Sequence, residues 1–355
     1  MHVGMISYCL PVVGKKRGGI ERVAHDLAEG LTRKGHRVRV WSYDPRPPGA
    51  SYEVVPMPFR KFFQSWLGHR LTMGYLGNLF SLWVNTEGCD VIVAHGDSLL
   101  LPLKHRRVIR IFHGSALAEA LSSKSFLRAV AQFGVYLQEI ASAFLCREAV
   151  AVSQATRKHH PWVRRVISNG VNLSGFSPNG SQKTPDPSIL FVGTLGGRKR
   201  GSMLLGWFEN NIRPRFPAAR LHMVCPSGPP LPGVTYHPGS GETELAMLYR
   251  SAWVLASPSE YEGFGLPYIE AMASGTAVIA TPNPGSEEVL ENGAFGCLAT
   301  DTEFADRLIE LLSNELERRR LAEAGLSRAR EFDLERTVAS YEQLIRGISE
   351  ERKAA

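Results

Sequence analysis

Residues 257–275 have the sequence SPSEYEGFGLPYIEAMASG, and their pattern predicts a glycine loop followed by a helix. The apolar run Trp253–Ala256 comes directly before them and is typical of a buried strand. Pro267 suits the first turn of a helix, and Gly275 suits its end. The free N–H groups of a glycine loop and of a helix N-terminus attract anions. We therefore predict an anion site at this turn.

Two carboxylates, Glu262 and Glu270, flank the predicted anion site. We expect Glu262 to stand in the loop beside the anion. We expect Glu270 to lie in the first turn of the helix, where its carboxylate can accept hydrogen bonds from two vicinal hydroxyls. The alternative is a surface connection with incidental glutamates, which the intervening GFGLP and the following EAMASG disfavour. An anion between two hydroxyl-binding carboxylates describes a nucleotide sugar.

Apolar runs alternate with helical patterns along the whole chain. The runs predict strands at Val3–Ile6, Val38–Trp41, Val91–Ala94, Val108–Phe112, Ala149–Val152, Arg165–Ile167, Ile189–Val192, Leu221–Val224, Val234–Tyr236, Trp253–Ala256 and Ala277–Ala280. Helical patterns occupy Ile20–Lys34, Phe126–Phe144, Glu242–Arg250, Thr302–Glu315 and Leu334–Glu350. Such alternation predicts an α/β protein with parallel sheets that helices cover on both faces.

The length of 355 residues suits two domains of common size. The stretch Ser177–Pro187 (SPNGSQKTPDP) is rich in Pro, Gly and Ser, which is typical of a linker. We therefore predict two doubly wound, Rossmann-like domains, at residues 1–170 and 171–334, with the linker at about 177–187.

The cysteines and apolar stretches favour a cytoplasmic protein. The five cysteines are scattered without a C-x-x-C pair, so neither a disulfide framework nor a zinc site is indicated. No secretory signal is visible, since the chain begins directly with a short apolar strand. The longest apolar stretch, Ala129–Cys146, is interrupted by Gln132, Gln138 and Glu139 and is not expected to span a bilayer.

The segment at Glu262 resembles the E-x7-E signature of the retaining glycosyltransferases of family 4. That family has the GT-B fold, two Rossmann-like domains with an interdomain cleft. The resemblance implies that Glu262 faces the donor sugar and that Glu270 holds the nucleotide ribose. It also implies that the backbone at Phe264, Gly265 and Leu266 meets the sugar and the diphosphate.

Residues 189–200, ILFVGTLGGRKR, predict a strand that runs into a glycine-rich loop with three cations. Such a loop suits a diphosphate, although a solvated basic turn is the alternative. The commonest pattern of the family has an Arg directly after the first Gly and a Lys further along. Lys199 takes the Lys position, but Thr194 stands where the Arg is usual. Arg198 is then the candidate for the missing charge.

His113 ends an apolar strand in RIFHGS, at the place where α/β crevices bind ligands. It resembles the family histidine near the donor sugar, and we assign it a catalytic role with Glu262 and Lys199. His95, in VAHGD, has a similar setting and is the rival.

Two further segments resemble donor-binding parts of the family. Gly18 and Gly19 follow the first strand and open the first helix, where the backbone can approach an anion. Asn169 lies in SNGVN, which is similar to the family's N-G-V-D segment at the domain junction, although Asn172 replaces the usual Asp. A hinge role is favoured for this segment, with a sugar contact of Asn169 as the other possibility.

Charge divides unevenly between the halves. Residues 1–170 hold 23 Lys and Arg against 11 Asp and Glu, a net +12, whereas residues 171–355 hold 18 against 23, a net −5. A basic N-terminal half favours an anionic partner, although a solvated basic surface is the alternative. The stretch Phe59–Val84 mixes aromatic and basic residues and suits either a membrane interface or helices that shape the acceptor cleft.

The resemblance implies transfer of a hexosyl group, with retention, from a UDP-sugar or GDP-mannose to an acceptor hydroxyl. The C-terminal domain would bind the donor and the N-terminal domain an acceptor glycan or lipid-linked saccharide, in polysaccharide, lipopolysaccharide or glycolipid synthesis. The C-terminal helix, about 335–355, would pack back on the N-terminal domain. No D-x-D occurs, and we expect no cofactor and no metal. The inner face of the membrane is a possible location.

Other functions fit the pattern less well. A nucleotide-sugar epimerase is the main alternative among enzymes, while a phosphorylase would need pyridoxal phosphate and usually a longer chain. A non-catalytic nucleotide-sugar or lipid-surface binding protein is disfavoured because Glu262, Glu270 and Lys199 are all present. Nucleic-acid binding has no supporting motif.

Overall fold

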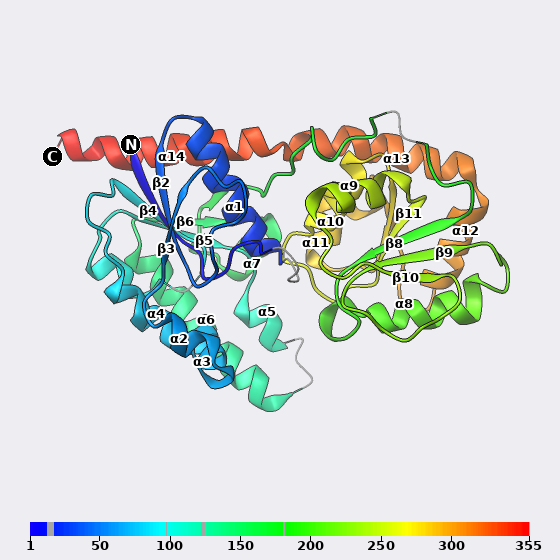
Figure 1. Cartoon of the computed structure of the whole chain (residues 1–355), viewed down its shortest axis with the longest axis horizontal. Helices are drawn as coiled ribbons and strands as arrows, with labels where there is room; N and C mark the ends of the chain where they lie inside the picture. Colours follow the sequence, from blue (N-terminus) through cyan, green and yellow to red (C-terminus); the bar gives the residue numbers. More distant parts are fainter. Residues whose placement is uncertain (13–17, 97, 122–124, 180–181, 355) are drawn as a thin grey trace. The chain divides into compact units, whose positions relative to one another are not determined.

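The computed structural model describes residues 1–12, 18–96, 98–121, 125–179 and 182–354 (Figure 1). Its internal contacts divide the chain into two compact units. The first unit combines the chain up to Asn169 with the C-terminal segment from Glu335, and the second runs from Gly170 to Leu334. The predicted linker, of which residues 180 and 181 lie outside the described residues, falls within the second range.

The first unit contains a seven-stranded parallel sheet in the order β3-β2-β1-β4-β5-β6-β7. Its strands are β1 His2–Ile6, β2 Arg37–Ser42, β3 Glu53–Pro56, β4 Val91–Ala94, β5 Val108–Phe112, β6 Glu148–Ala151 and β7 Arg165–Val166. Its α-helices are α1 Gly19–Arg33, α2 Arg60–Gln64, α3 Trp66–Leu71, α4 Gly77–Phe80, α5 Ala116–Leu121, α6 Phe126–Leu145, α7 Gln154–His159 and α14 Leu334–Ala354. From β1 the chain adds β2 and β3 on one side of the sheet and then β4 to β7 on the other side, so the strand order reverses between β1 and β4, as in a doubly wound fold.

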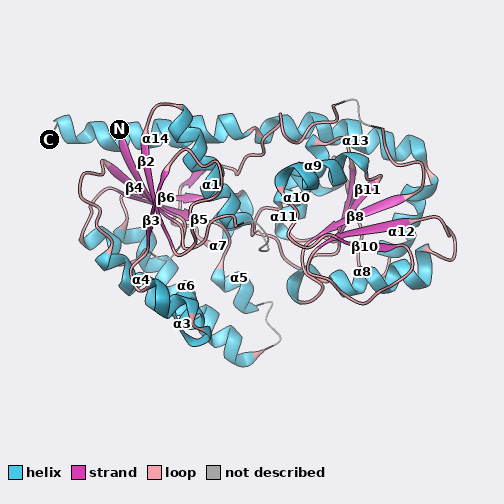
Figure 2. Cartoon of the chain, viewed as in Figure 1, coloured by secondary structure: helices cyan, strands magenta, loops and turns pink. Residues whose placement is uncertain are grey.

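The second unit repeats this plan with a six-stranded parallel sheet in the order β10-β9-β8-β11-β12-β13. Its strands are β8 Ser188–Val192, β9 Arg220–Val224, β10 Val234–Tyr236, β11 Val254–Ser257, β12 Ala277–Ala280 and β13 Cys297–Leu298. Its α-helices are α8 Gly201–Trp207, α9 Glu242–Ser251, α10 Leu266–Ala273, α11 Pro284–Val289, α12 Phe304–Ser313 and α13 Glu315–Ala329. Figure 2 shows helices around both sheets.

The predicted α/β class and the two doubly wound sheets are confirmed. All eleven predicted strands are present with boundaries within one residue, and the edge strands β3 and β13 were missed. The single helix predicted at Thr302–Glu315 is wrong in its end, because Asn314 starts a new helix. Its side-chain oxygen accepts a hydrogen bond from the Glu317 amide at 3.1 Å and caps α13.

The centre of the second sheet is buried on both faces. Every residue of β11 and β12 is buried, and Phe191, Phe208 and Phe304 fill the core beside them. Apolar side chains on both faces explain why these strands appear in the sequence as continuous apolar runs. The loops that leave their carboxyl ends therefore start from a rigid base.

No helix within the described ranges has the length and apolar character needed to cross a bilayer. The longest, α14, packs on the first unit. A Cβ on Gly30 of α1 would lie only 2.4 Å from a methyl group of Val338, so the two helices touch where Gly30 has no side chain. His36 and Lys34 contact the Glu342 carboxylate at 3.1 and 3.2 Å.

We predict that Gly30→Ala lowers the free energy of unfolding by about 1–2 kcal/mol, because the added methyl group overpacks the contact with Val338. The change should show in urea denaturation. Gly347→Ala on α14 is the matched control, since no neighbouring atom lies within 4 Å of its added Cβ. It should instead stabilise by about 0.5–1 kcal/mol. Val338→Ala combined with Gly30→Ala should recover most of the loss, and additive losses would contradict the contact.

Candidate functional site

The predicted anion site lies at the point where the second sheet reverses its strand order. Strands β8 and β11 are neighbours there, with Ile189 opposite Val254 and Leu190 opposite Leu255. The chain leaves β8 into residues 193–200 and leaves β11 into residues 258–265. Ligands of open parallel sheets bind outside the carboxyl ends of the strands at such a switch point.

The loop after β8 folds tightly and brings its cations together. The helical turn Gly197–Lys199 begins at Gly197, which has a positive φ of 65°. The Lys199 side chain packs over Gly193, where an added Cβ would lie 3.1 Å from the Lys199 Cβ. Thr194 donates to the Gly196 carbonyl at 2.9 Å, so its hydroxyl serves the loop itself.

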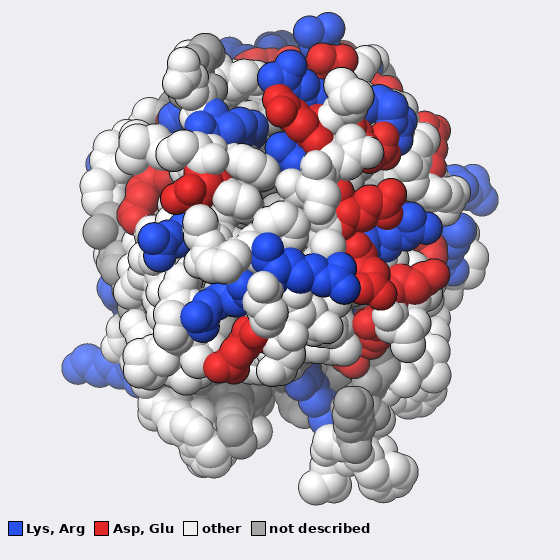
Figure 3. Space-filling model, turned by 90° about the vertical axis from the view of Figure 1, so that its right-hand side faces the viewer, with Lys and Arg blue, Asp and Glu red and all other residues white. Residues whose placement is uncertain are grey.

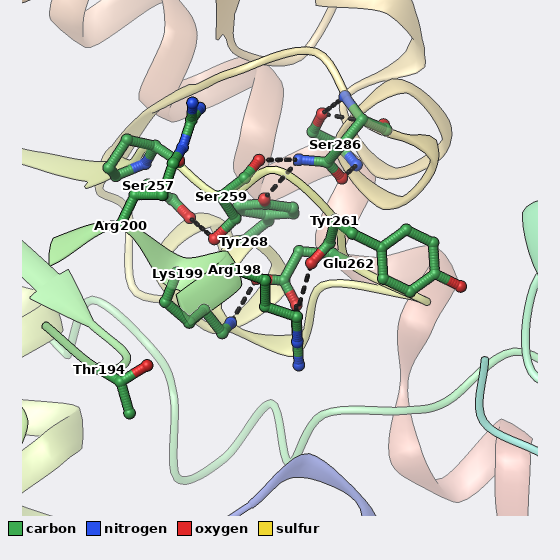
Figure 4. Close-up of polar contacts among 12 residues, drawn as sticks. Thr194, Arg198, Lys199, Arg200, Ser257, Ser259, Tyr261, Glu262, Tyr268 and Ser286 are labelled. Atoms are coloured by element: carbon green, nitrogen blue, oxygen red, sulfur yellow. Dashed lines mark hydrogen bonds and ion pairs between the residues drawn. The ribbon is translucent and has the colours of Figure 1, made fainter. Parts of the chain in front are cut away.

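Glu262 forms ion pairs with two of the three cations of this loop, Arg198 and Lys199 (Figure 4). Arg198 Nη1 donates to Glu262 Oε2 at 2.8 Å and to the Tyr261 carbonyl at 2.6 Å. Lys199 Nζ donates to Glu262 Oε1. The Glu262 side chain is 7% exposed, compared with 15% for Lys199 and 46% for Arg198. The two loops are thus joined by one buried carboxylate and two cations at the mouth of the switch point.

The electrostatics of this cluster favour an ionised Glu262. Burial by itself would raise the pKa of the carboxyl. The charges of Lys199 and Arg198, and their hydrogen bonds, outweigh this effect and hold the pKa of Glu262 below its ordinary value. The site therefore holds one net positive charge around the carboxylate, with Arg198 partly accessible to a ligand.

Arg200, the third cation, has a structural position that the sequence did not reveal. Its guanidinium donates to both carboxylate oxygens of Asp301 at 2.7 and 2.8 Å, and its Nε donates to the Pro258 carbonyl at 2.6 Å. It thereby ties the β8 loop to the β11 loop and to the segment after β13. Asp301 lies 101 residues away in sequence, so no local pattern signals the pair.

A second layer of polar groups supports the β11 loop. Thr281 and Asn283 donate to the Ser259 carbonyl at 2.7 and 3.0 Å. Asn283 also caps α11 through a reciprocal capping box with Ser286, a signal that the sequence NPGS carries and that we overlooked. Gly285 allows this packing, since an added Cβ would lie 2.8 Å from the Glu262 carbonyl oxygen.

The helix after the loop is confirmed, but one detail of the prediction is wrong. Helix α10 begins at Leu266 after Gly265, whose φ of 98° requires glycine, and Gly275 follows its end. Glu270 is the fifth residue of α10 and lies beyond its first turn, because Leu266 is already helical. Glu270 is buried, as is Phe264, whose ring lies edge-on to Phe332 at 5.7 Å. Gly265 has no side chain to cap the helix. Pro267 has no N–H and the Tyr268 amide donates to the Gly265 carbonyl at 2.9 Å, so among the first three residues of α10 the Leu266 amide is the one that could meet an anion.

The two rival histidines lie together in the first unit. His95 Nδ1 and His113 Nε2 are 3.0 Å apart, and the rings stack at 5.2 Å. Loss of hydration, with the nearby Arg110 charge, lowers the pKa of His95 to about 3. The same loss of hydration, with His95 and Arg110, lowers the pKa of His113 well below its ordinary value. Both rings are therefore neutral at pH 7, and the sequence-based choice between them stays open.

The remaining predicted residues also belong to strand ends and junctions of the first unit. Gly18 precedes α1, which begins at Gly19, so this glycine pair opens the first helix as expected. Asn169 is buried and ends the first unit. Its Oδ1 has no hydrogen-bond partner among the described residues.

Figure 3 shows Lys and Arg intermixed with Asp and Glu on the face that it presents. Among the residues that the structure describes, no group of three or more His, Cys, Asp and Glu is arranged to hold a metal ion. The Arg198–Lys199–Glu262 cluster is thus the site whose chemistry we pursue.

Comparison with known proteins agrees with this arrangement. Residues 17–174 match the family model described as Glycosyltransferase Family 4, and residues 231–328 match that of Glycosyl transferases group 1. A D-inositol 3-phosphate glycosyltransferase of Paenarthrobacter aurescens is 33% identical over 52% of this chain and 52% of the relative, so the match spans about half the length of that relative. A phosphatidyl-myo-inositol mannosyltransferase of Mycobacterium tuberculosis is 25% identical over 94% of this chain and 93% of its own.

A solved structure shares the fold. The Anabaena protein Alr3699/HepE, determined in complex with UDP-glucose, superimposes with a TM-score of 0.75 at 16% identity and covers 98% of this chain and all of its own. Two doubly wound units, the two family models and this likeness agree with one another. The chain therefore belongs to glycosyltransferase family 4 and has the GT-B fold.

Proposed function

We propose that the protein is a retaining glycosyltransferase that takes its sugar from a nucleoside diphosphate sugar. The observation that carries the proposal is the meeting of Arg198 and Lys199 with Glu262 at the switch point of the second sheet. The N-terminus of α10, which no side chain caps, begins in the same loop. Together these groups offer two cations and a helix N-terminus to a diphosphate.

The roles of the residues follow from this placement. Lys199 and Arg198 would bind the diphosphate and stabilise the charge that develops on it as it leaves. Arg198 would then supply the charge that the family usually places at the position of Thr194. Glu262, released from the cations, would accept hydrogen bonds from donor-sugar hydroxyls, and buried Glu270 would hold the ribose. The backbone at Phe264, Gly265 and Leu266 would face the sugar and phosphates.

The transfer step that we propose keeps the attack and the departure on one face of the sugar. The acceptor oxygen bonds to the anomeric carbon as the bond from that carbon to the phosphate oxygen breaks. The acceptor proton passes to the leaving phosphate, and the products are a glycoside and a nucleoside diphosphate. Glu262 and Glu270 are not cast as the carboxylate pair of a covalent double displacement, because Glu262 orients the donor sugar and Glu270 holds the ribose in this scheme. We propose a catalytic role for His113, which would act as a neutral group because its pKa is lowered.

The site suggests the class of the donor and of the acceptor. UDP-sugars and GDP-mannose both suit the site, and the Anabaena relative was crystallised with UDP-glucose. We propose that the basic first unit binds a glycan or lipid-linked acceptor at the inner face of the membrane, and that its Gly18, Gly19 and Asn169 take part in donor binding. No metal is needed in this scheme, because Arg198 and Lys199 neutralise the diphosphate. An epimerase would turn over the donor without an acceptor, which distinguishes the main alternative.

We predict that at least one of UDP, GDP, UDP-glucose and GDP-mannose raises the melting temperature of the protein in the presence of EDTA. Lys199→Ala should weaken that nucleotide by about 10- to 100-fold in calorimetry, because a charge-assisted hydrogen bond to phosphate is lost. Arg319→Ala is the matched control, since Arg319 is 71% exposed in a surface ion pair of α13. No stabilisation by any of the four ligands would contradict the proposed donor class.

Glu262→Gln should distinguish recognition of the donor sugar, which we assign to Glu262, from binding of the diphosphate, which we assign to Lys199 and Arg198. We expect kcat to fall by roughly a hundredfold, because a misplaced donor sugar no longer meets the acceptor. The affinity for the nucleoside diphosphate without sugar should stay within about threefold of the wild type or rise, since Lys199 and Arg198 lose a competing carboxylate. Equal losses for sugar-free nucleotide and for turnover would argue against the proposed division of roles.

The stability contributed by Glu262 should depend on pH. At pH 7 we expect Glu262→Gln to lower the free energy of unfolding by about 2 kcal/mol, less than for a fully buried pair because Arg198 is partly exposed. Because the folded pKa of Glu262 is lowered, its contribution is complete above the unfolded value of about 4.3 and is lost as pH falls through the folded pKa. Urea titrations should therefore converge for the two proteins at acid pH, and a constant difference would contradict the ion pairs.

A further inference from the structure

Helix α6, Phe126–Leu145, is an apolar helix that stays outside the core of the first unit. Of its 20 residues only Ser142 is buried. A surface helix normally turns its apolar stripe to the core, and a helix that is apolar all round is normally buried. Helix α6 does neither, so its apolar surface requires an explanation.

Five exposed apolar side chains of α6 form one stripe. Phe126, Val130, Phe133, Leu137 and Phe144 recur at helical spacing, and each is at least 50% exposed. The stripe runs nearly the whole helix, roughly 30 Å at 1.5 Å per residue.

Polar groups of the same helix point the other way. Gln138 accepts from the Asn78 side chain, and Glu139 accepts from His160 Nε2 at 3.0 Å and from the Ala116 amide at 3.2 Å. The Glu139 side chain is 12% exposed. Polar contacts of Glu139 thus share the inner side of α6 with Tyr136 and Ala143, which pack near Trp162 and Phe112, while the apolar stripe stays exposed.

Short helices beside α6 extend this apolar surface. The helical turn Thr72–Leu76, between α3 and α4, contacts α6, where Tyr75 donates to the Ala131 carbonyl at 3.3 Å, and Asn78 of α4 contacts Gln138. Trp66 of α3 is 71% exposed, and Trp83, three residues after the end of α4, is 55% exposed. We call the α6 stripe with Phe59, Phe62, Trp66, Tyr75 and Trp83 the α6 face.

The charges around the α6 face are mostly positive. Residues 54–86 contain no Asp or Glu but do contain Arg60 and Lys61. Helix α6 contributes Arg128, which lies 3.8 Å from the carboxylate of Glu119 on α5. The whole stretch 1–170 carries a net +12. A second copy of the chain would bring like charges together, whereas an anionic surface would be attracted.

We propose that the α6 face docks on an anionic lipid bilayer, with α6 lying in the plane of the interface. Exposed Trp and Tyr rings suit the headgroup level, and the Phe, Leu and Val stripe suits the acyl boundary below it. Arg60 and Lys61 then meet lipid phosphates. This surface gives the proposed membrane location a physical basis and does not depend on the identity of the donor.

Vesicle sedimentation with the full chain tests the proposal. The wild type should sediment with vesicles of phosphatidylcholine and phosphatidylglycerol, and far less with phosphatidylcholine alone. Phe133→Ser combined with Leu137→Ser should lower the vesicle partition coefficient by about tenfold or more, because two apolar side chains no longer enter the interface. Leu316→Ser is the matched control, since Leu316 is 81% exposed on α13 of the second unit, and it should sediment as the wild type does.

Three outcomes would overturn the proposal. One is equal sedimentation of the double variant and the wild type, and another is equal binding to vesicles with and without phosphatidylglycerol. The third is a wild-type dimer in analytical ultracentrifugation that the double variant loses while neither protein binds vesicles, which would make the face a contact between copies. Circular dichroism melting checks that the double variant is folded. The vesicle assay needs no nucleotide, so it can succeed or fail independently of the donor proposal.

Discussion

The buried Glu262 carboxylate is the constraint on which the second unit's site depends. A charge taken out of water is costly unless opposite charges and hydrogen bonds replace its hydration. Lys199 and Arg198 supply both, and both come from the loop after β8. Removing either cation would leave the carboxylate under-compensated in a poorly hydrated position. The contact therefore holds the β8 and β11 loops in one arrangement, which neither loop would keep alone.

The sheet order and two glycines make that contact possible. Because β8 and β11 are neighbours at the reversal of strand order, their loops leave side by side with no intervening strand. Gly193 leaves room for the Lys199 stem, and Gly285 lets α11 approach the backbone at Glu262. Arg200 adds a second tie through Asp301 and the Pro258 carbonyl. Local glycines and long-range ion pairs thus act together on the same loop.

The interior of the fold was predictable because its strands are buried on both faces and appear as continuous apolar runs. Two of the four edge strands were missed: β3 has only Val54 and Val55 between Glu53 and Pro56, and β13 has only Cys297 and Leu298, whereas β7 and β10 were predicted. The motif at Glu262 predicted the loop and the helix. It did not predict that Glu262 forms ion pairs with Lys199 and Arg198, the two cations that we expected to bind the phosphates. That pairing joins residues 63 and 64 positions apart, and sequence spacing carries no information about it.

For α6 the apolar pattern predicted the helix correctly. It did not predict which apolar side chains of the helix would stay exposed to solvent.

The ion cluster also constrains how a donor would enter. A diphosphate that binds Lys199 and Arg198 competes with Glu262 for the same N–H hydrogen-bond donors. If the phosphate simply displaced the carboxylate, Glu262 would be left buried and unpaired, at a cost that would offset much of the binding. A donor that carries sugar hydroxyls within reach of Glu262 avoids this cost, because each hydroxyl can donate to the released carboxylate. Under this scheme the site recognises the sugar and the diphosphate together. The diphosphate displaces the Glu262 carboxylate from Lys199 and Arg198, and the sugar hydroxyls then donate hydrogen bonds to that carboxylate. Discrimination against sugar-free nucleotide would then arise from the burial of Glu262 itself, and it should weaken when that carboxylate is replaced by an amide.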